Sequence, residues 1–247
     1  MGKRPGVRRR GRGGMQFRAA TTYKLKPAKY PSFSLDEERR GDIIDLVHES
    51  GRDVPLAKVR FENGSVSFIP APLGTKVGQR MNFGLNSEII DGNVISIQNI
   101  PDGTIVCNVE QQFGDGGALM KSAGADATIF SHADDGVILK LASGKFKKLN
   151  PKNRAMIGTL AGGGVEDRPL MRAGVKMMRY KSKGHKYPIV RGVAQAAYVH
   201  PHGGGRHQHV GQSSTVSRNA PPGAKVGSIA ARKTGRARIK ERKQSIK

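Results

Sequence analysis

The chain has 247 residues, enough for one or two domains, and few of the side chains that build large cores: it has no Trp, 33 Gly and only 5 % aromatic residues. Its formal net charge is +24, which favours a polyanionic partner, and its single cysteine excludes a disulfide framework and a cysteine-based metal site. Residues 1–35 have ten Lys or Arg and no acid, residues 36–170 are near neutral, and residues 171–247 have eighteen Lys or Arg against Glu241. Two such arms repel themselves unless a polyanion neutralises them, and nucleic acid releases counterions at each phosphate contact.

The sequence predicts an intracellular, cytoplasmic protein with no membrane partner. Residues 1–14 lack the apolar run of a signal peptide, and no apolar stretch approaches the roughly 20 residues of a membrane span. A lone Cys107 fits a reducing compartment. The basic arms show no amphipathic period that would insert into lipid.

Residues 1–34 are predicted to be a basic RNA-binding arm, extended and disordered in isolation. Pro27 and Pro31 break any helix. We expect the cations of the arm to meet phosphates, and its rings to stack on bases or to anchor to the globule. These rings are Phe17, Tyr23 and Tyr30.

Residues 35–84 are predicted to form a small five-stranded oligonucleotide-binding barrel. Alternating residues on both sides of Asn63-Gly64 indicate a β-hairpin, the clearest one in the chain. Short strands with frequent turns and no convincing helix favour the barrel. The expected strands are residues 42–47, 56–61, 66–70 and one or two within 77–85.

Residues 85–170 are predicted to form a second small barrel, of SH3-like type. Apolar runs separated by about 8–12 residues and by glycine turns are typical of such folds. The fold class is therefore all-β, with two barrels and long basic N- and C-terminal extensions. The expected strands are residues 94–97, 104–109, 127–130, 137–141, 145–149 and 155–160.

Residues 171–247 are predicted to be a basic, irregular RNA-binding extension. They mix Lys and Arg with Gly, Pro, Ser and His, and contain no stretch that could build a third core. The spacing of Val226, Ile229 and Ala230 allows one short helix within residues 224–234.

A glycine-rich loop at residues 114–124 has some features of a phosphate-binding loop. A Walker-type loop needs glycine directly before its lysine, and Met120 stands before Lys121 here. Two other interpretations remain open. The segment is either a long barrel loop or a backbone-rich surface that touches RNA, with Lys121 as its phosphate partner.

The segment 199–211 concentrates four of the seven histidines, three consecutive glycines and Arg206. It cannot bury an apolar face of its own, so we expect a partner to hold it in shape. Its alternate histidines could ligate zinc, but no thiolate lies nearby and no carboxylate lies between Asp167 and Glu241. Without a nearby carboxylate to orient an imidazole, a nucleophilic triad is also disfavoured. A solvated histidine cluster without a role is possible; packing into folded RNA, with close approach at the glycines, is the favoured interpretation.

Several separated motifs resemble those of one family, the universal large-subunit ribosomal protein L-two. They lie in the expected order and the similarity runs nearly from end to end. They are Cys-Asn-Val-Glu at residues 107–110, the loop 114–124, Arg-Gly-Val-Ala at 191–194, His-Pro-His-Gly-Gly-Gly at 200–205 and Ser-Arg-Asn-Ala-Pro-Pro-Gly at 217–223.

Residues 8–14 and 207–209 resemble the archaeal and eukaryotic branch of that family. The family usually has an acidic residue before the His-Pro pair and often Met-Asn after Arg-Gly-Val-Ala. This chain has Val199 and residues 195–196 (Gln-Ala) there. No neighbouring carboxylate therefore polarises His200, which indicates a structural histidine.

The resemblance implies the two barrels, arms embedded in RNA, and a place in the large ribosomal subunit near the peptidyl-transferase region, with a part in subunit association. The implied partners are large-subunit ribosomal RNA, neighbouring ribosomal proteins and the small subunit at the intersubunit face. We expect no enzymatic activity, small-molecule substrate or cofactor, Mg²⁺ being held through the RNA. A free nucleic-acid chaperone or packaging protein is the alternative. The candidate RNA-binding residues are Arg8, Arg9, Arg10, Arg12, Lys121, Ser122, Arg172, Lys176, Arg179, Lys183, Arg191, His200, His202, Gly203, Gly204, Gly205, Arg206, His207, His209, Arg218, Lys225, Arg232, Lys233 and Arg236.

Overall fold

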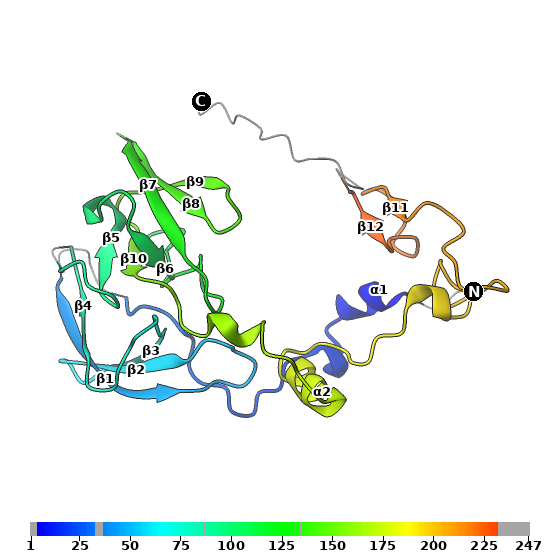
Figure 1. Ribbon diagram of the computed structural model, residues 1–247, viewed down its shortest axis with the longest axis horizontal. Coiled ribbons are helices and arrows are strands. Elements are labelled where there is room, and N and C mark those ends of the chain that lie inside the picture. The colour runs from blue at the N-terminus through cyan, green and yellow to red at the C-terminus, as the bar shows by residue number, and fades with distance from the viewer. Residues whose placement is uncertain (1–3, 33–36, 86, 134, 232–247) are drawn as a thin grey trace. The chain divides into compact units, whose positions relative to one another are not determined.

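A computed structural model describes residues 4–32, 37–85, 87–133 and 135–231 (Figure 1). The chain divides into two compact units, one of residues 20–176 and one of residues 1–19 with 177–247. Each is described by itself. No helix within the described ranges is both long enough and apolar enough to cross a membrane.

The larger unit is built on one ten-stranded sheet with the order β3-β2-β1-β4-β5-β10-β6-β7-β8-β9 (Figure 1). Most neighbours pair antiparallel, while β4 and β5 pair parallel through Phe83 and Val94. The expected all-β class is confirmed, and the sheet is consistent with an oligonucleotide-binding barrel and an SH3-like barrel. The strands are β1 (Arg39–Val47), β2 (Leu56–Phe61), β3 (Val66–Pro70), β4 (Arg80–Phe83), β5 (Val94–Ser96), β6 (Ile105–Cys107), β7 (Ala127–Ala133), β8 (Gly136–Leu141), β9 (Phe146–Leu149) and β10 (Arg154–Ile157).

The predicted hairpin is confirmed in β2 and β3, which pair antiparallel from Leu56 opposite Pro70 to Arg60 opposite Val66. The Asn63 side chain stabilises the turn, because its Oδ1 accepts hydrogen bonds from the backbone N–H of Ser65 at 3.0 Å and from its hydroxyl at 2.6 Å. The residue pattern that predicted the hairpin therefore also supplies the side chain that closes it.

Two apolar cores lie on opposite sides of three shared strands. Val94 of β5 and Cys107 of β6 pack into one core, whereas their chain neighbours Ile95 and Val106 pack into the other. Side chains alternate between the faces of a strand, so β5, β6 and β10 contribute to both cores. The division of the chain into barrels at residues 35–84 and 85–170 stays a prediction, and the first core draws on residues from both ranges.

The end of the basic arm belongs to the larger unit. Ala28 and Tyr30 are each only 4 % exposed. The Tyr30 hydroxyl donates to the carbonyl of Asn108 at 2.7 Å, and its backbone N–H donates to the carbonyl of Gly116 at 3.1 Å. Of the two roles expected for its ring, Tyr30 therefore has the anchoring one, and the predicted arm boundary at residue 34 lies too late in the chain.

The smaller unit and the connection to it contain short elements. The arm was expected to be extended, but it begins with α1 (Gly6–Arg10) and η1 (Met15–Phe17). Further along the chain come α2 (Ala173–Ser182) and η4 (Gly192–Ala194). Two short parallel strands, β11 (Thr215–Val216) and β12 (Ser228–Ile229), complete the described part.

Two expectations for the C-terminal extension are wrong. It contains helix α2, which the sequence did not predict; none of its residues is buried, so its apolar side chains have no core to face. The short helix allowed within residues 224–234 is replaced, in the described part of that range, by strand β12 (Ser228–Ile229). Gly227 precedes that strand with a φ of +80°, a conformation that a helix interior does not allow.

Candidate RNA-binding surface

Residues 191–211, called the glycine-histidine segment below, fold back on themselves. The backbone N–H groups of Val199 and His200 donate to the carbonyl of Ala196 at 2.9 and 3.2 Å, and that of Gly204 donates to the carbonyl of Gln195 at 3.0 Å. These bonds form successive turns between residues 195 and 204. The segment therefore has internal backbone structure that its composition did not predict.

The glycines of this segment are required by the chain's own packing. A Cβ atom on Gly192 would lie 2.3 Å from Cε1 of His200, and one on Gly203 would lie 2.3 Å from the carbonyl oxygen of Gln195. Gly204 has a φ of +83°, which side chains rarely adopt. The sequence interpretation assigned Gly203 and Gly204 to close approach by RNA, whereas the contacts found here are with the protein itself.

The side chains of His200 and His202 contact each other. Their ring centroids lie 5.0 Å apart, and Nδ1 of His200 accepts a hydrogen bond from the backbone N–H of His202 at 3.0 Å. Burial lowers the pKa of His200 from its ordinary value, and nearby His202 lowers it further. A lowered pKa favours the neutral imidazole, which is the form that can accept this bond.

The ring of His202 points into the smaller unit. Its Nε2 is buried and has no hydrogen-bond partner within the described part of the chain, and a Cβ atom on Gly227 would lie 3.4 Å from its Cε1. Within the described ranges, no group of three or more His, Cys, Asp or Glu side chains is placed to hold a metal ion. The two histidines therefore do not assemble the ligand set that a zinc site needs.

The remaining candidates of the C-terminal extension are distributed over helix α2, its flanks and the segments that follow it. The Arg191 guanidinium donates to Oε1 of Gln208 at 2.8 Å, which links two residues 17 positions apart in the chain. Helix α2 contains Lys176 and Arg179, has no acid in its first turn, and ends with basic residues. Lys183, Gly205 and Lys225 lie in the connecting turns. The exposed candidates of the extension are Arg172, Arg191, Gly205, Arg206, His207, His209 and Arg218.

The N-terminal candidates lie on and just after helix α1. Arg8, Arg9 and Arg10 form its last turn and are exposed, as is Arg12. Arg18 folds back and donates from Nε to the carbonyl of Gly13 at 2.9 Å. The arm thus presents its guanidinium groups from a short helical turn. Arg232, Lys233 and Arg236 lie outside the described residues.

Lys121 has a structural contact that the sequence did not reveal. Its Nζ donates to the carbonyls of Ala28 at 2.7 Å and Gly117 at 2.9 Å, which links the loop 114–124 to the anchored part of the arm. Burial lowers its pKa, with smaller contributions from Arg52 and Lys29. Its neighbour Ser122 is exposed. The Lys121 ammonium is therefore bonded to backbone carbonyls of the larger unit, and its role as a phosphate partner stays a prediction.

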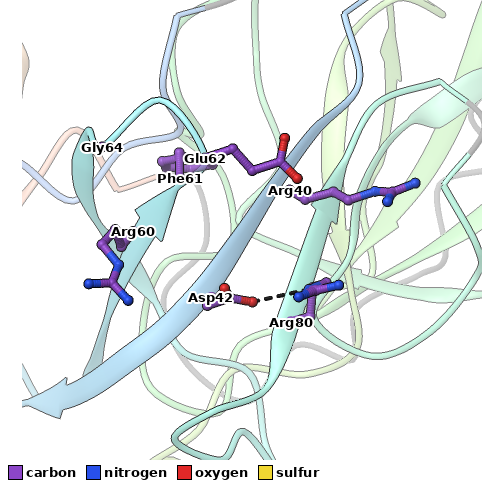
Figure 2. Close-up of a pocket in the computed structure, with 7 residues that line it drawn as sticks. All are labelled: Arg40, Asp42, Arg60, Phe61, Glu62, Gly64 and Arg80. Carbon is purple, nitrogen blue, oxygen red and sulfur yellow. Dashed lines mark hydrogen bonds and ion pairs between the residues drawn. The ribbon is translucent and has the colours of Figure 1, made fainter.

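Sequence reasoning missed a basic pocket on strands β1, β2 and β4, with a volume of about 260 Å³ and open to solvent. Figure 2 shows Asp42 of β1 paired with Arg80 of β4, through an Nε–Oδ1 contact of 3.1 Å, and the guanidinium groups of Arg40 and Arg60 on opposite sides of that pair. The period-2 pattern of the strands was the signal available in the sequence, since it directs these arginines outwards. The residues lining the pocket are Arg40, Asp42, Arg60, Phe61, Glu62, Gly64 and Arg80.

The described part of the chain is therefore an all-β scaffold protein with long basic extensions, in which His200 and His202 contact each other. Residues 90–242 match the family model described as Ribosomal Proteins L2, C-terminal domain. The chain belongs to this ribosomal protein L2 family, as its motifs predicted.

Three archaeal relatives match the chain over nearly its whole length. It is 76 % identical over 243 residues to the large ribosomal subunit protein uL2 of Cenarchaeum symbiosum (strain A), covering 98 % of this chain and 100 % of the relative. The uL2 protein of Nitrosopumilus maritimus (strain SCM1) is 75 % identical over 244 residues, with the same coverage. That of Sulfolobus acidocaldarius is 45 % identical over 236 residues, covering 96 % of this chain and 98 % of the relative. These relatives confirm the archaeal side of the predicted branch.

Proposed function

We propose that this protein is a constituent of the large ribosomal subunit that binds large-subunit ribosomal RNA in the cytoplasm. In this proposal it shapes the peptidyl-transferase region, contacts neighbouring ribosomal proteins and supports association with the small subunit. The observation that carries the proposal is the segregation of charge: eighteen Lys or Arg against one acid in residues 171–247, next to a near-neutral globule. A chain so divided has one part that folds and another that neutralises phosphates.

The two parts have different physical tasks. The sheet and its two cores give a rigid platform, since apolar burial stabilises residues 20–176 without a partner. The basic extension has few buried apolar residues, Val226 among them at 4 % exposure. Its stability in the assembled particle therefore comes from phosphate contacts, and Mg²⁺ bound by the RNA screens the phosphates that the protein does not reach.

His200 is proposed to position the segment and to do no chemistry. Val199 precedes it, and its Nδ1 is already occupied by the N–H of His202. A general acid or base typically contributes about 100- to 10,000-fold to a rate. We therefore expect that His200→Gln slows single-turnover peptidyl transfer by much less than that in fully assembled subunits, and that it mainly impairs incorporation or subunit joining. A thousandfold loss in such subunits, with intact RNA structure, would overturn the structural role.

Sedimentation of the tagged full chain in a cell extract tests the proposal as a whole. Comigration with large subunits that survives a wash in high salt is expected for a built-in constituent. Distribution over nucleic acid of all sizes, lost in the same wash, is expected of a free packaging protein and would contradict the proposal.

A further inference from the structure

Two phenylalanine rings lie together on the outer face of strands β7, β8 and β9. Phe130 of β7 is 52 % exposed and Phe146 of β9 is 45 % exposed. Their centroids are 4.8 Å apart and their planes meet at 63°, an edge-to-face arrangement. The register between β7 and β8 shifts between Ile129 and Ser131, so Phe130 occupies a bulge, and bulges redirect side chains. This leaves a pair of large apolar rings in water.

Lysines share this face with the rings. Lys140 of β8 is the register partner of Phe146 and also of Thr128, and cross-strand partners lie on the same side of a sheet. Lys148 lies two residues after Phe146, hence on the same side, and forms an exposed ion pair with Asp135. We call Phe130, Lys140, Phe146 and Lys148 the aromatic–lysine face.

The aromatic–lysine face shares no residue with the candidate sites described above. It lies at one end of the ten-stranded sheet, where β9 is the last strand, so that the face continues to a sheet edge. Both rings project away from the second core, which takes Ile129 and Leu149 from the same strands. Neither core packing nor the known ion pair therefore accounts for the position of the rings.

We propose that the aromatic–lysine face binds an unpaired segment of RNA, with a base stacked on Phe130 or Phe146 and the flanking phosphates at Lys140 and Lys148. Aromatic side chains beside cations are how proteins bind single-stranded nucleic acid, because every base has a π-face and every linkage has a charge. An exposed Lys148–Asp135 pair is weak and can exchange its carboxylate for a phosphate. This inference rests on the proposed function, since it takes ribosomal RNA as the partner.

The charge of the face favours RNA over a protein surface. It presents two lysines and one carboxylate around its rings, in a chain with a net charge of +24. Most other proteins of an assembly held together by RNA must also neutralise phosphate, so they would meet this face with like charge. An unpaired RNA segment offers both a flat base that can cover the rings and the negative charge that the lysines can neutralise.

The first test is ultraviolet cross-linking of large subunits that contain the full chain, followed by mass spectrometry of nucleotide adducts. The expected result is an adduct on Phe130 or Phe146. Adducts confined to the basic extension and arm would overturn this inference while supporting the proposed function. The inference would also be overturned if Lys140 and Lys148 formed chemical cross-links to proteins only. A complete lack of nucleotide adducts in the chain would overturn the inference and would also count against the proposed function.

The second test compares the purified full chain with its Phe130→Leu and Phe146→Leu variants. Leucine keeps an apolar side chain and removes the ring, so the fold is preserved, which circular dichroism checks. The probe is an unstructured RNA oligonucleotide of about 12 nucleotides at about 0.5 M salt, where phosphate contacts are weakened. We expect about tenfold weaker binding for each variant. Leu73→Ala is the matched control, since Leu73 is 68 % exposed and outside the face. Unchanged affinity in both phenylalanine variants, or an equal loss in the control, would overturn the proposal.

Discussion

Arg154 and Glu110 form a two-pronged ion pair in the interior of the larger unit. Arginine Nη2 lies 2.6 Å from Oε1 and Nε lies 3.1 Å from Oε2, and the two side chains are 3 % and 0 % exposed. The carboxylate also accepts the backbone N–H groups of Arg154 and Gly116. The guanidinium lies 5.6 Å from the ring centre of Tyr30. One buried pair thus joins strand β10, the loop 114–124 and the anchored end of the arm.

Arg154→Met is expected to lower the free energy of unfolding by about 3–5 kcal/mol, because it leaves the Glu110 carboxylate buried without its counter-charge. Denaturant unfolding followed by circular dichroism measures the loss. Arg80→Gln is the control: its partner Asp42 is half exposed, and such pairs contribute less than about 1 kcal/mol. If the two substitutions lowered the free energy of unfolding equally, burial of the Arg154–Glu110 pair would not explain the loss of stability.

Limited digestion with trypsin is expected to leave a fragment that starts before Ala28. Lys26 is followed by proline, which trypsin does not cleave, and Lys29 lies between two buried residues. The protected fragment should begin at Leu25 and end near residue 176, with Tyr30 retained. In Tyr30→Ala, cleavage after Lys29 should become rapid. A wild-type fragment that begins at Tyr30 would contradict the anchor.

The structure of the histidine segment is expected to weaken at acidic pH. The pKa of His200 is lowered in the folded chain, so the unfolded chain binds more protons between that lowered value and 6.5. The contribution of His200 is complete above about pH 6.5 and is lost as the pH falls through this interval. An NMR titration should give a pKa below 6.5 for His200, and the His202 amide should lose protection as Nδ1 becomes protonated. A pKa at or above 6.5 would remove the basis of this prediction.

Gly204→Val is expected to block incorporation into large subunits. A β-branched side chain resists a φ of +83°, and its Cβ would lie 2.9 Å from the Cβ of Ala197. Gly223→Val is the matched control in the same extension, because a Cβ there meets no atom within 4 Å. Quantitative mass spectrometry of purified subunits measures the occupancy of each variant. Similar occupancy for both would show that the turn at Gly204 is dispensable.

Affinity for structured ribosomal RNA is expected to fall steeply with salt. The two arms together have 28 Lys or Arg, and even six phosphate contacts would cost roughly a thousandfold in affinity between about 50 and 200 mM salt. Filter binding over that range gives the slope. Replacing Arg8, Arg9 and Arg10 by Gln should make the slope shallower by up to about three units. If the RNA affinity of the wild-type chain did not change with salt concentration, phosphate binding by the arms would be contradicted.

The sequence by itself determined the strands, the Asn63-Gly64 hairpin, the separation of charge and the family. These are local properties: alternation with a period of two, turn chemistry and composition act over a few neighbouring residues. The strand β2 at Leu56–Phe61 and the strand β3 at Val66–Pro70 have the predicted bounds for that reason.

Only the tertiary structure decided which residues that are distant in the sequence contact each other. Arg154 and Glu110 are 44 positions apart, and the Tyr30 hydroxyl bonds a carbonyl 78 positions away, so no local pattern reveals either contact. The aromatic–lysine face depends equally on a register shift that brings Phe130 to Phe146. Helix α2 was missed because it has no buried face to give its residues a period. Strand pairing, side-chain burial and strand register depend on contacts between distant parts of the chain. A short stretch of sequence therefore does not reveal them.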